Sequence, residues 1–260
     1  YYAIYSEKLP LIKYFSTLKG VNLKAKDDDN KTFLHQAADL SEPETITTYL
    51  MSLKKIPIGA KDKENKTILH YAIRNGNLNF IKNLCKREEF DITGTDTEGL
   101  NILHIVCDQS SANVDVIRYI ISLKKIDINA KTKEGKTALS YLCDNGSNLQ
   151  AIKYFSELKG VDHTVVDEDG ETLLHIAVAR NELPVIKYLI SLNKIKITAT
   201  DKKGRTILHV ACEEGQLQLV RYLISLDKLD VGAVDKDGKT ILHYACDNYC
   251  NYFEIIQYII

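Results

Sequence analysis

The sequence predicts an all-α repeat solenoid, an array of similar helix pairs stacked side by side, and three observations predict it. A short pattern, Thr-x-Leu-His, recurs seven times in the 260 residues, with Asn101 in place of the Thr in one copy and Ser140 in place of the His in another. Successive copies are 34 to 36 residues apart, a period typical of repeats that each form one supersecondary unit. Two stretches with apolar residues at helical spacing follow each copy. Scattered catalytic residues would not recur in this way.

Each unit is expected to begin with a tight turn and a helix N-cap. Two residues before the pattern stands a residue type that tolerates a left-handed backbone, at Asn30, Asn65, Gly99, Gly135, Gly170, Gly204 and Gly238. The N-cap, which can accept a hydrogen bond from an amide of the first helical turn, is Thr32, Thr67, Asn101, Thr137, Thr172, Thr206 or Thr240. The motif His is His35, His70, His104, His175, His209 or His243, with Ser140 in the fourth copy.

Two helices follow in each unit. Helix A is short and carries the Leu of the pattern and small residues such as Ala37 and Ala38. Helix B has apolar residues at helical spacing, as in 185–192, and Pro10 and Pro184 lie near its start, where a missing amide hydrogen is harmless. The register predicts a single array over 1–260, with helix pairs at approximately 1–19, 32–55, 67–88, 101–124, 137–159, 172–194, 206–228 and 240–260.

Both ends of the sequence fall inside this register. Residues 1–4 align with 70–73, so residue 1 is expected inside a helix A, and the last helix, 253–260, is strongly apolar. Repeat arrays need polar capping units at their ends. We therefore expect the sequence to be a fragment of a longer protein.

The repeated residues resemble the ankyrin repeat family, whose consensus reads Gly-x-Thr-Pro-Leu-His-x-Ala. The resemblance covers the whole chain and implies a curved array of helix pairs joined by β-hairpin loops, with a concave recognition face. The Pro of the consensus is replaced in every copy. The Gly that ends helix B in the family survives only as Gly20 and Gly160. Elsewhere Lys55, Lys125, Lys194 and Lys228 occupy that position, so we expect a different geometry there, because a left-handed non-Gly residue costs roughly 1 kcal/mol.

Differences in repeat length fall in the turn between helix A and helix B, for example in 108–113 and 247–251. The hairpin side stays in register in every copy. Insertions in a solenoid map to loops on one face. This turn is interpreted as the edge that tolerates insertions, and the alternative is a second contact surface.

Composition limits the classes of partner. The 34 basic and 35 acidic residues leave a net charge of −1, without the basic surplus of a phosphate-backbone binder, so no nucleic acid is expected. No apolar run approaches the roughly 20 residues that span a bilayer, and no segment has the pattern of a signal peptide. We expect an intracellular, cytoplasmic monomer that is not inserted in a membrane.

Cysteine and histidine recur at fixed positions, which favours structural roles. Four of the six cysteines occupy one position of helix A and are interpreted as small core residues rather than a disulfide framework: Cys107, Cys143, Cys212 and Cys246. A His-x-x-Cys zinc site is disfavoured, because zinc ligands lie about 2.0–2.3 Å from one ion, whereas equivalent residues of stacked repeats are roughly 8–10 Å apart. The resemblance implies that the motif His forms hydrogen bonds within and between hairpins. We expect these imidazoles to be neutral and buried, so that acid destabilises the fold.

The sequence does not indicate an enzyme. It contains no Gly-rich phosphate loop, no Gly-x-Ser-x-Gly and no His-Glu-x-x-His. The Asp at the start of most hairpins is interpreted as turn chemistry: Asp27, Asp62, Asp96, Asp167, Asp201 and Asp235. We expect no catalytic residue, no cofactor and no metal.

The face of helix A that points away from the core is the candidate binding surface. The residue after the motif His shares this face with those three and four positions later: Tyr71 and Arg74, Ile105 and Asp108, Tyr141 and Asp144, Ile176 and Arg180, Val210 and Glu213, Tyr244 and Asp247. The resemblance implies that hairpin residues border it: Lys133, Lys136, Lys202, Lys203, Arg205, Lys236 and Lys239. We hypothesise an aromatic and apolar ribbon whose exposed tyrosines anchor a partner. The alternative is that these residues pack between neighbouring A helices.

The resemblance thus implies a protein-interaction module that binds a protein or peptide on the concave face. A structural or regulatory spacer within a larger enzyme, channel or effector is the alternative. Exposed aromatic or apolar side chains on that face would support recognition, and a uniformly charged, solvated face would support the spacer. The identity of the partner does not follow from a scaffold.

Overall fold

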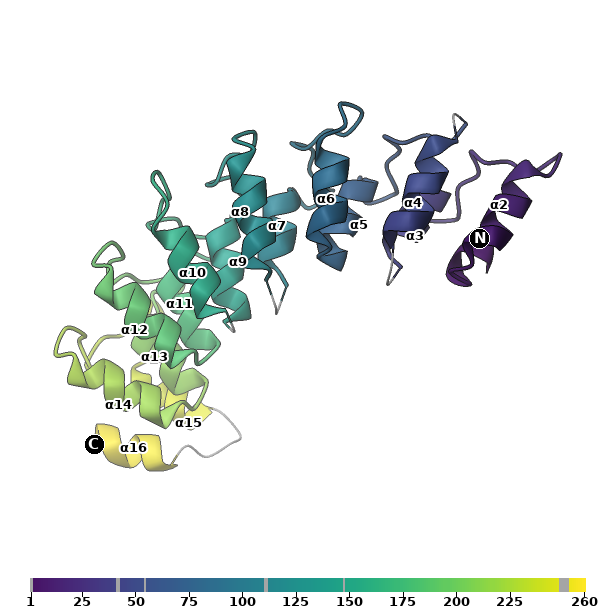
Figure 1. The fold of residues 1–260 in the computed structure, drawn as a ribbon. Coiled ribbons are helices and arrows are strands. Elements are labelled where there is room, and N and C mark those ends of the chain that lie inside the picture. The colour runs from purple at the N-terminus through teal and green to yellow at the C-terminus, as the bar shows by residue number, and fades with distance from the viewer. Residues whose placement is uncertain (1, 41–42, 54, 110–111, 147, 248–252) are drawn as a thin grey trace. The chain divides into compact units, whose positions relative to one another are not determined.

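The structure, a computed structural model, describes residues 2–40, 43–53, 55–109, 112–146, 148–247 and 253–260, and of Asp247 only the backbone. The chain forms two compact units. Unit 1 comprises 1–109 and 113–127, and unit 2 comprises 110–112 and 128–260. Each unit is a stack of helix pairs, as Figure 1 shows.

The described residues form sixteen helices and no β-strand. The odd-numbered ones, called A helices below, are α1 (Tyr2–Tyr5), α3 (Phe33–Ala38), α5 (Ile68–Asn75), α7 (Ile102–Cys107), α9 (Ala138–Asn145), α11 (Leu173–Ala179), α13 (Ile207–Glu213) and α15 (Ile241–Asp247). The even-numbered ones, called B helices, are α2 (Leu9–Thr17), α4 (Pro43–Ser52), α6 (Leu78–Cys85), α8 (Val114–Ser122), α10 (Leu149–Ser156), α12 (Leu183–Ser191), α14 (Leu217–Ser225) and α16 (Phe253–Ile259). This arrangement confirms the all-α repeat solenoid.

The turns before the A helices confirm the left-handed backbone expected from the sequence. Asn30 and Asn65 have φ of 61° and 63°, and Gly99, Gly135, Gly170, Gly204 and Gly238 have φ between 74° and 83°. The loops are tight hairpins, and in two of them an isolated antiparallel bridge joins Val166 to Thr172 or Val234 to Thr240.

The ends of three B helices show the altered geometry that the missing Gly predicts. After α10 the left-handed residue is Gly160, at φ 91°. After α8, α12 and α14 it lies closer to the helix, at Lys124, Asn193 and Asp227, with φ between 51° and 53°. Asn and Asp tolerate this conformation better than other non-Gly residues. A Leu follows each of these four helices: Leu123, Leu158, Leu192 and Leu226. The left-handed residue is the first one after this Leu at the ends of α8, α12 and α14, and the second one after it at the end of α10.

The core of each unit lies between its A and B helices. In unit 2 α11 packs against α12, and the side chains of the motif Leu174, Ile186 and Leu189 on these helices are fully buried. The thiols of Cys107, Cys143 and Cys212 are buried as well, which confirms them as small core residues. The same expectation is wrong for Cys246, which is exposed. Among the described helices only α13 and α16 have extensive contacts with α15, so its far side lacks a covering neighbour.

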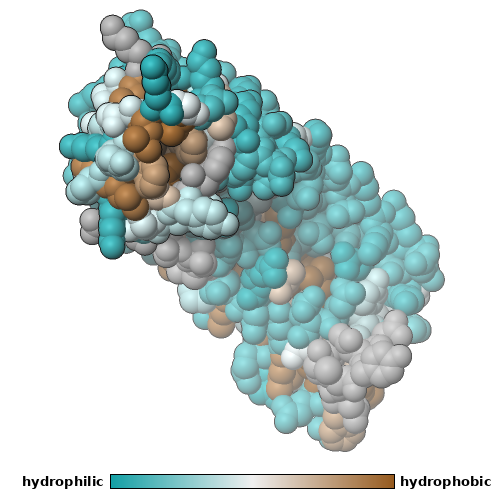
Figure 2. Space-filling view, turned by 90° about the vertical axis from the view of Figure 1, so that its right-hand side faces the viewer, coloured by the Kyte–Doolittle hydropathy of each residue, from teal (hydrophilic) through white to brown (hydrophobic). Residues whose placement is uncertain are grey.

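The end of unit 1 formed by α1 and α2 is apolar. Figure 2 shows hydrophobic side chains gathered on the end nearest the viewer. Tyr2 is 93 % exposed and Phe15 is 42 % exposed. A cavity of about 440 Å³ lies there, lined by Ile4, Ile12 and Leu50 among others.

None of the helices in the described part of the chain combines the length and the hydropathy that a membrane span requires.

Candidate interaction surface

Six of the seven hairpins are organised by an Asp at their start, and the fourth has Thr132 there. One carboxylate oxygen of Asp62, Oδ1, accepts the backbone N–H groups of Glu64 at 2.9 Å and Lys66 at 2.8 Å. The same pair of bonds recurs at Asp27, Asp96, Asp167 and Asp235. A carboxylate that accepts backbone amides two and four residues on closes the turn. The interpretation of these residues as turn chemistry is confirmed.

The second oxygen of this Asp binds a side chain from the following A helix. Tyr71 Oη donates to Asp62 Oδ2 at 2.7 Å, and Tyr244 Oη donates to Asp235 Oδ2 at 2.7 Å. Burial, reinforced by the bond to Asp62, raises the pKa of Tyr71 well above its usual range. The hydrogen bond from Tyr244 lowers the pKa of Asp235. These tyrosines therefore link helix to hairpin.

The motif His joins each A helix to its own N-cap. The backbone N–H of Thr67 donates to Nδ1 of His70 at 3.1 Å, and the Thr67 hydroxyl lies 2.9 Å from the same nitrogen. Because Nδ1 accepts a hydrogen bond, the proton of the neutral imidazole lies on Nε2. In the fourth copy the Ser140 hydroxyl accepts the N–H of Thr137 at 3.2 Å, so this part of the cap survives without an imidazole.

The proton on Nε2 joins one repeat to the next. His35 Nε2 donates to the carbonyl of Lys66 and His175 Nε2 donates to the carbonyl of Arg205, each at 3.1 Å. The ring of His35 also meets Tyr71 edge-on, with 5.5 Å between the ring centroids. These contacts agree with the structural role that the family resemblance implied for the histidines.

Burial keeps most of these imidazoles neutral. His35, His70, His175 and His209 are at most 2 % exposed, and desolvation lowers the pKa of each, to about 4 for His70. His104 is equally buried. His243, on α15, is exposed, which differs from the expectation for the same reason as Cys246.

Backbone hydrogen bonds connect the tips of successive hairpins within each unit. In unit 1 the N–H of Lys63 donates to Asp29 O and that of Thr97 to Glu64 O, both at 2.9 Å. In unit 2 the donors and acceptors are Glu168 to Glu134, Lys202 to Asp169 and Lys236 to Lys203, at 2.8 to 2.9 Å. The tips of a unit therefore form one fixed row.

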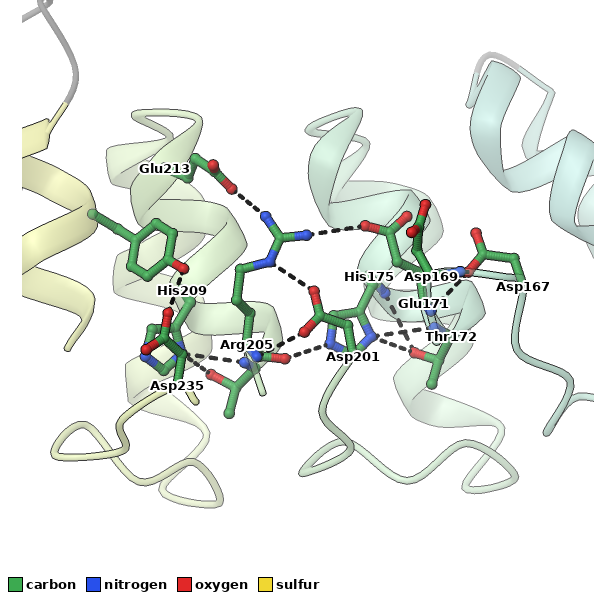
Figure 3. A network of polar contacts seen from close by, with 12 residues as sticks. Asp167, Asp169, Glu171, Thr172, His175, Asp201, Arg205, His209, Glu213 and Asp235 are labelled. Atoms are coloured by element: carbon green, nitrogen blue, oxygen red, sulfur yellow. Dashed lines mark hydrogen bonds and ion pairs between the residues drawn. The ribbon is translucent and has the colours of Figure 1, made fainter. Parts of the chain in front are cut away.

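The side chain of Arg205 connects two repeats on this surface in unit 2. Figure 3 shows its guanidinium between three carboxylates from two repeats. Nε donates to Asp201 Oδ2 at 2.6 Å, Nη1 to Glu213 Oε2 at 2.6 Å and Nη2 to Glu171 Oε1 at 3.3 Å. Because Val210 is too short to reach the hairpin Asp, Arg205 occupies the acceptor that a tyrosine takes elsewhere. Burial raises the pKa of Glu171.

A second ion-pair group links α9 to α11. Asp144 Oδ1 lies 2.7 Å from Arg180 Nε, and its Oδ2 lies 3.6 Å from Lys136 Nζ. Asp144 of α9 is thus paired with a cation from the next repeat.

Unit 1 has a polar hollow of about 580 Å³ on the same surface. Side chains of both signs line it: Lys31, Lys66, Arg74, Glu64, Asp96 and Asp108. Gln109 closes one side, because its Nε2 donates to the carbonyls of Ile73 and Arg74 at 3.1 and 3.0 Å. The hollow also meets His70, whose Nε2 has no acceptor among the described residues.

The aromatic and apolar part of the predicted ribbon differs from the expectation of exposed anchors. Tyr71, Tyr141, Ile176 and Val210 are buried, at most 8 % exposed, while Ile105 and Tyr244 are half-buried. The rings of Tyr71 and Tyr244 are held against the surface by hydrogen bonds from their hydroxyls to the hairpin Asp and by edge-on contact with the His of the preceding repeat. The open alternative, packing between neighbouring A helices, describes Tyr71 better.

The charged residues of the prediction remain accessible to different degrees. Arg74, Asp108, Lys133, Arg180, Lys202, Lys203 and Lys236 are exposed, and Lys136, Asp144, Arg205, Glu213 and Lys239 are half-buried. The side chain of Asp247 and the insertions near 110–111 and 248–252 lie outside the described residues.

Three residues of the surface were missed from the sequence: Lys31, Lys66 and Glu171. All occupy the hairpin position immediately before the N-cap, which is also the position of Arg205. Sequence reasoning selected basic hairpin residues in only three of the seven hairpins. The period itself was the available signal, because equivalent residues of a repeat share one environment.

Tight hairpins, capped A helices and B helices that recur at one period define a helical repeat protein. A family model described as ankyrin repeats (3 copies) matches residues 1–96, 141–235 and 174–260. The chain belongs to the ankyrin repeat family, whose repeats are in general protein–protein interaction modules and typically lack enzymatic activity. A search of curated proteins gave no match.

Proposed function

We propose that this chain binds a protein or peptide along the surface formed by its A helices and hairpin tips. One observation carries the proposal: backbone hydrogen bonds fix the tips of each unit in a single row. The backbone of such a row is already ordered, so a partner loses little of its binding energy to ordering these loops. We also propose that residues 1–260 act as one array of repeats and that the protein is intracellular.

Charge and burial suggest the character of the partner. In unit 2 the exposed tips present Lys133, Lys202, Lys203 and Lys236. In unit 1 the hollow offers both signs and the N–H of His70. The tyrosine hydroxyls are already engaged, so polar and charged groups, rather than aromatic anchors, are proposed to select the partner.

Selection from a displayed random peptide library on the immobilised chain tests the proposal. Affinities of the selected peptides are then measured for the wild type and for K202E/K203E. The matched control is K194E/K196E, which reverses two exposed lysines in the loop after α12. We expect K202E/K203E to weaken binding about tenfold or more, because it replaces attraction by repulsion at two sites, and the control to change it less than about twofold. If no peptide is selected, or if the two variants have equal effects, the alternative of a structural or regulatory spacer would be favoured.

A further inference from the structure

The B helices of unit 2 carry a second row of charges on a different set of helices. Within the bounds of α10, α12 and α14 the only charged residues are Lys153, Lys187 and Arg221, one on each helix and all cationic. They occupy equivalent positions 34 residues apart, and all three are exposed. This set is called the cation row below.

Each member of the cation row is held over an aromatic ring of the next B helix. Lys153 Nζ lies 5.7 Å from the ring centroid of Tyr188 and Lys187 Nζ lies 5.1 Å from that of Tyr222. Arg221 Cζ lies 5.2 Å from the ring centroid of Tyr258. A cation over a ring face is attracted to it, and a long side chain that is already ordered loses less entropy on binding.

The surroundings of the row are polar and partly apolar, with two exposed carboxylates: Glu157 lies four residues after Lys153, and Glu254 lies on α16 with Tyr258. Gln150, Pro184 and Gln218 lie one turn before the three cations and are exposed. The rings of Tyr188 and Tyr222 are half-buried, and that of Tyr258 is exposed. Tyr and Arg are enriched at the centres of protein interfaces. The patch combines regularly spaced positive charge with exposed ring surface.

We propose that the cation row docks an amphipathic acidic helix of a partner protein. Packed helices are roughly 8–10 Å apart, so successive cations recur at about that distance. Carboxylates seven residues apart on a helix recur at about 10.5 Å, which matches this spacing. Duplex DNA places a charge about every 1.7 Å, a far denser pattern than the row. Charge complementarity therefore selects an acidic helix as the occupant.

Cations occupy the equivalent position on three B helices of unit 1 as well: Lys13 on α2, Lys82 on α6 and Arg118 on α8. In unit 1 Lys13 lies 5.5 Å from the ring of Tyr49 and Lys82 lies 5.6 Å from the ring of Tyr119. Thr48 stands at the equivalent position of α4, so the sequence of cations is interrupted there. Among the described helices of unit 1, α6 and α8 therefore carry two successive cations, and α10, α12 and α14 of unit 2 carry three.

The test uses the full chain with labelled tyrosine rings and a synthetic Ala-based helical peptide with glutamate at every seventh position. A control peptide of the same composition has its glutamates five residues apart, which places them on different sides of the helix. We expect the signals of Tyr188 and Tyr222 to shift only with the first peptide. In K153Q/K187Q/R221Q the affinity is expected to fall about tenfold, the effect of losing three exposed ion pairs.

The matched control variant is K194Q/K196Q/K228Q, which removes three exposed lysines from the loops after α12 and α14, and its affinity is expected to stay within about twofold of the wild type. Equal shifts with both peptides, or an unchanged affinity in K153Q/K187Q/R221Q, would overturn the proposal. So would phosphatidylserine vesicles that shift these signals when the heptad peptide does not, since the row would then face a lipid surface. None of these outcomes depends on binding at the hairpin tips.

Discussion

Acid should unfold this protein through its motif histidines, and His70 allows the size of the effect to be worked out. The pKa of His70 is lowered by burial from 6.5 to about 4 in the folded chain. At pH 7.5 the imidazole is neutral in both the folded and the unfolded state, so the full stabilisation is present. As pH falls below 6.5 the unfolded state binds a proton that the folded state does not, and stability declines until the pH reaches about 4.

The expected loss between pH 7.5 and pH 5 is about 2 kcal/mol from His70 alone, because each pH unit below 6.5 is worth about 1.4 kcal/mol. His35, His175 and His209, whose pKa values are also lowered, add to this loss in the wild type. Protonation is opposed locally as well, because Nδ1 of His70 already accepts the N–H of Thr67. A second proton on the ring would break this capping bond.

Urea denaturation at pH 7.5, 6 and 5 measures the effect in the wild type and in His70→Ser. The variant copies the fourth repeat, where Ser140 keeps a capping bond without an imidazole. The free energy of unfolding of His70→Ser should fall by about 2 kcal/mol less than that of the wild type between pH 7.5 and 5. Identical pH slopes in the two proteins, or a wild type whose stability is flat over this range, would refute the reasoning.

Three further changes test individual contacts by urea denaturation at neutral pH. Tyr71→Phe should destabilise the fold by about 2 kcal/mol, since it removes a hydrogen bond to an ionised carboxylate. The control is Tyr188→Phe, which should cost less than about 0.5 kcal/mol, because the Tyr188 hydroxyl lies 3.5 Å from its acceptor. Similar losses in the two variants would contradict the role of Tyr71. Arg205→Met should cost about 3 kcal/mol, because it leaves the carboxylate of Asp201 without a counter-charge and the Asp201 side chain is only 1 % exposed. The control is Lys202→Met at an exposed position. A loss in Arg205→Met no larger than in this control would count against the network. Gly76→Ala and Gly170→Ala start from the same φ of 77°, so both should lose about 1 kcal/mol to backbone strain. The added Cβ of Gly170→Ala would also lie 2.8 Å from the N of Lys202, which should raise its loss to about 3 kcal/mol, and equal losses would mean that the hairpin row is not tight there.

The repeating parts of the fold could be predicted because one pattern recurs in every copy. The left-handed turns at Asn30 and Gly170, the N-cap Thr and the buried Leu all follow from local chemistry that the register repeats. Local rules suffice here, since turn and cap geometry depend on residues within a few positions of one another. Contacts between repeats are not local in this sense.

The site could be predicted less well, because side-chain contacts across repeats decide which residues are exposed. Helical periodicity places Tyr71 on the outward face of α5, yet its hydroxyl reaches back to Asp62 and its ring meets His35 of the preceding repeat. Arg205 was expected as an accessible charge at the edge of the surface. It instead holds three carboxylates together, which the spacing of one repeat does not reveal. Periodicity alone also gave no indication of the two units into which the chain divides.

Lysine acetylation footprinting tests the central claim most directly, with the chain alone and with a peptide selected on it. The surface of A helices and hairpin tips predicts that the peptide slows acetylation of Lys202, Lys203 and Lys236 severalfold, while Lys194 and Lys196 in the loop after α12 react as before. Mass spectrometry of the modified chain reads both sets in one experiment. Protection of Lys194 and Lys196 without protection of the tip lysines would contradict the account.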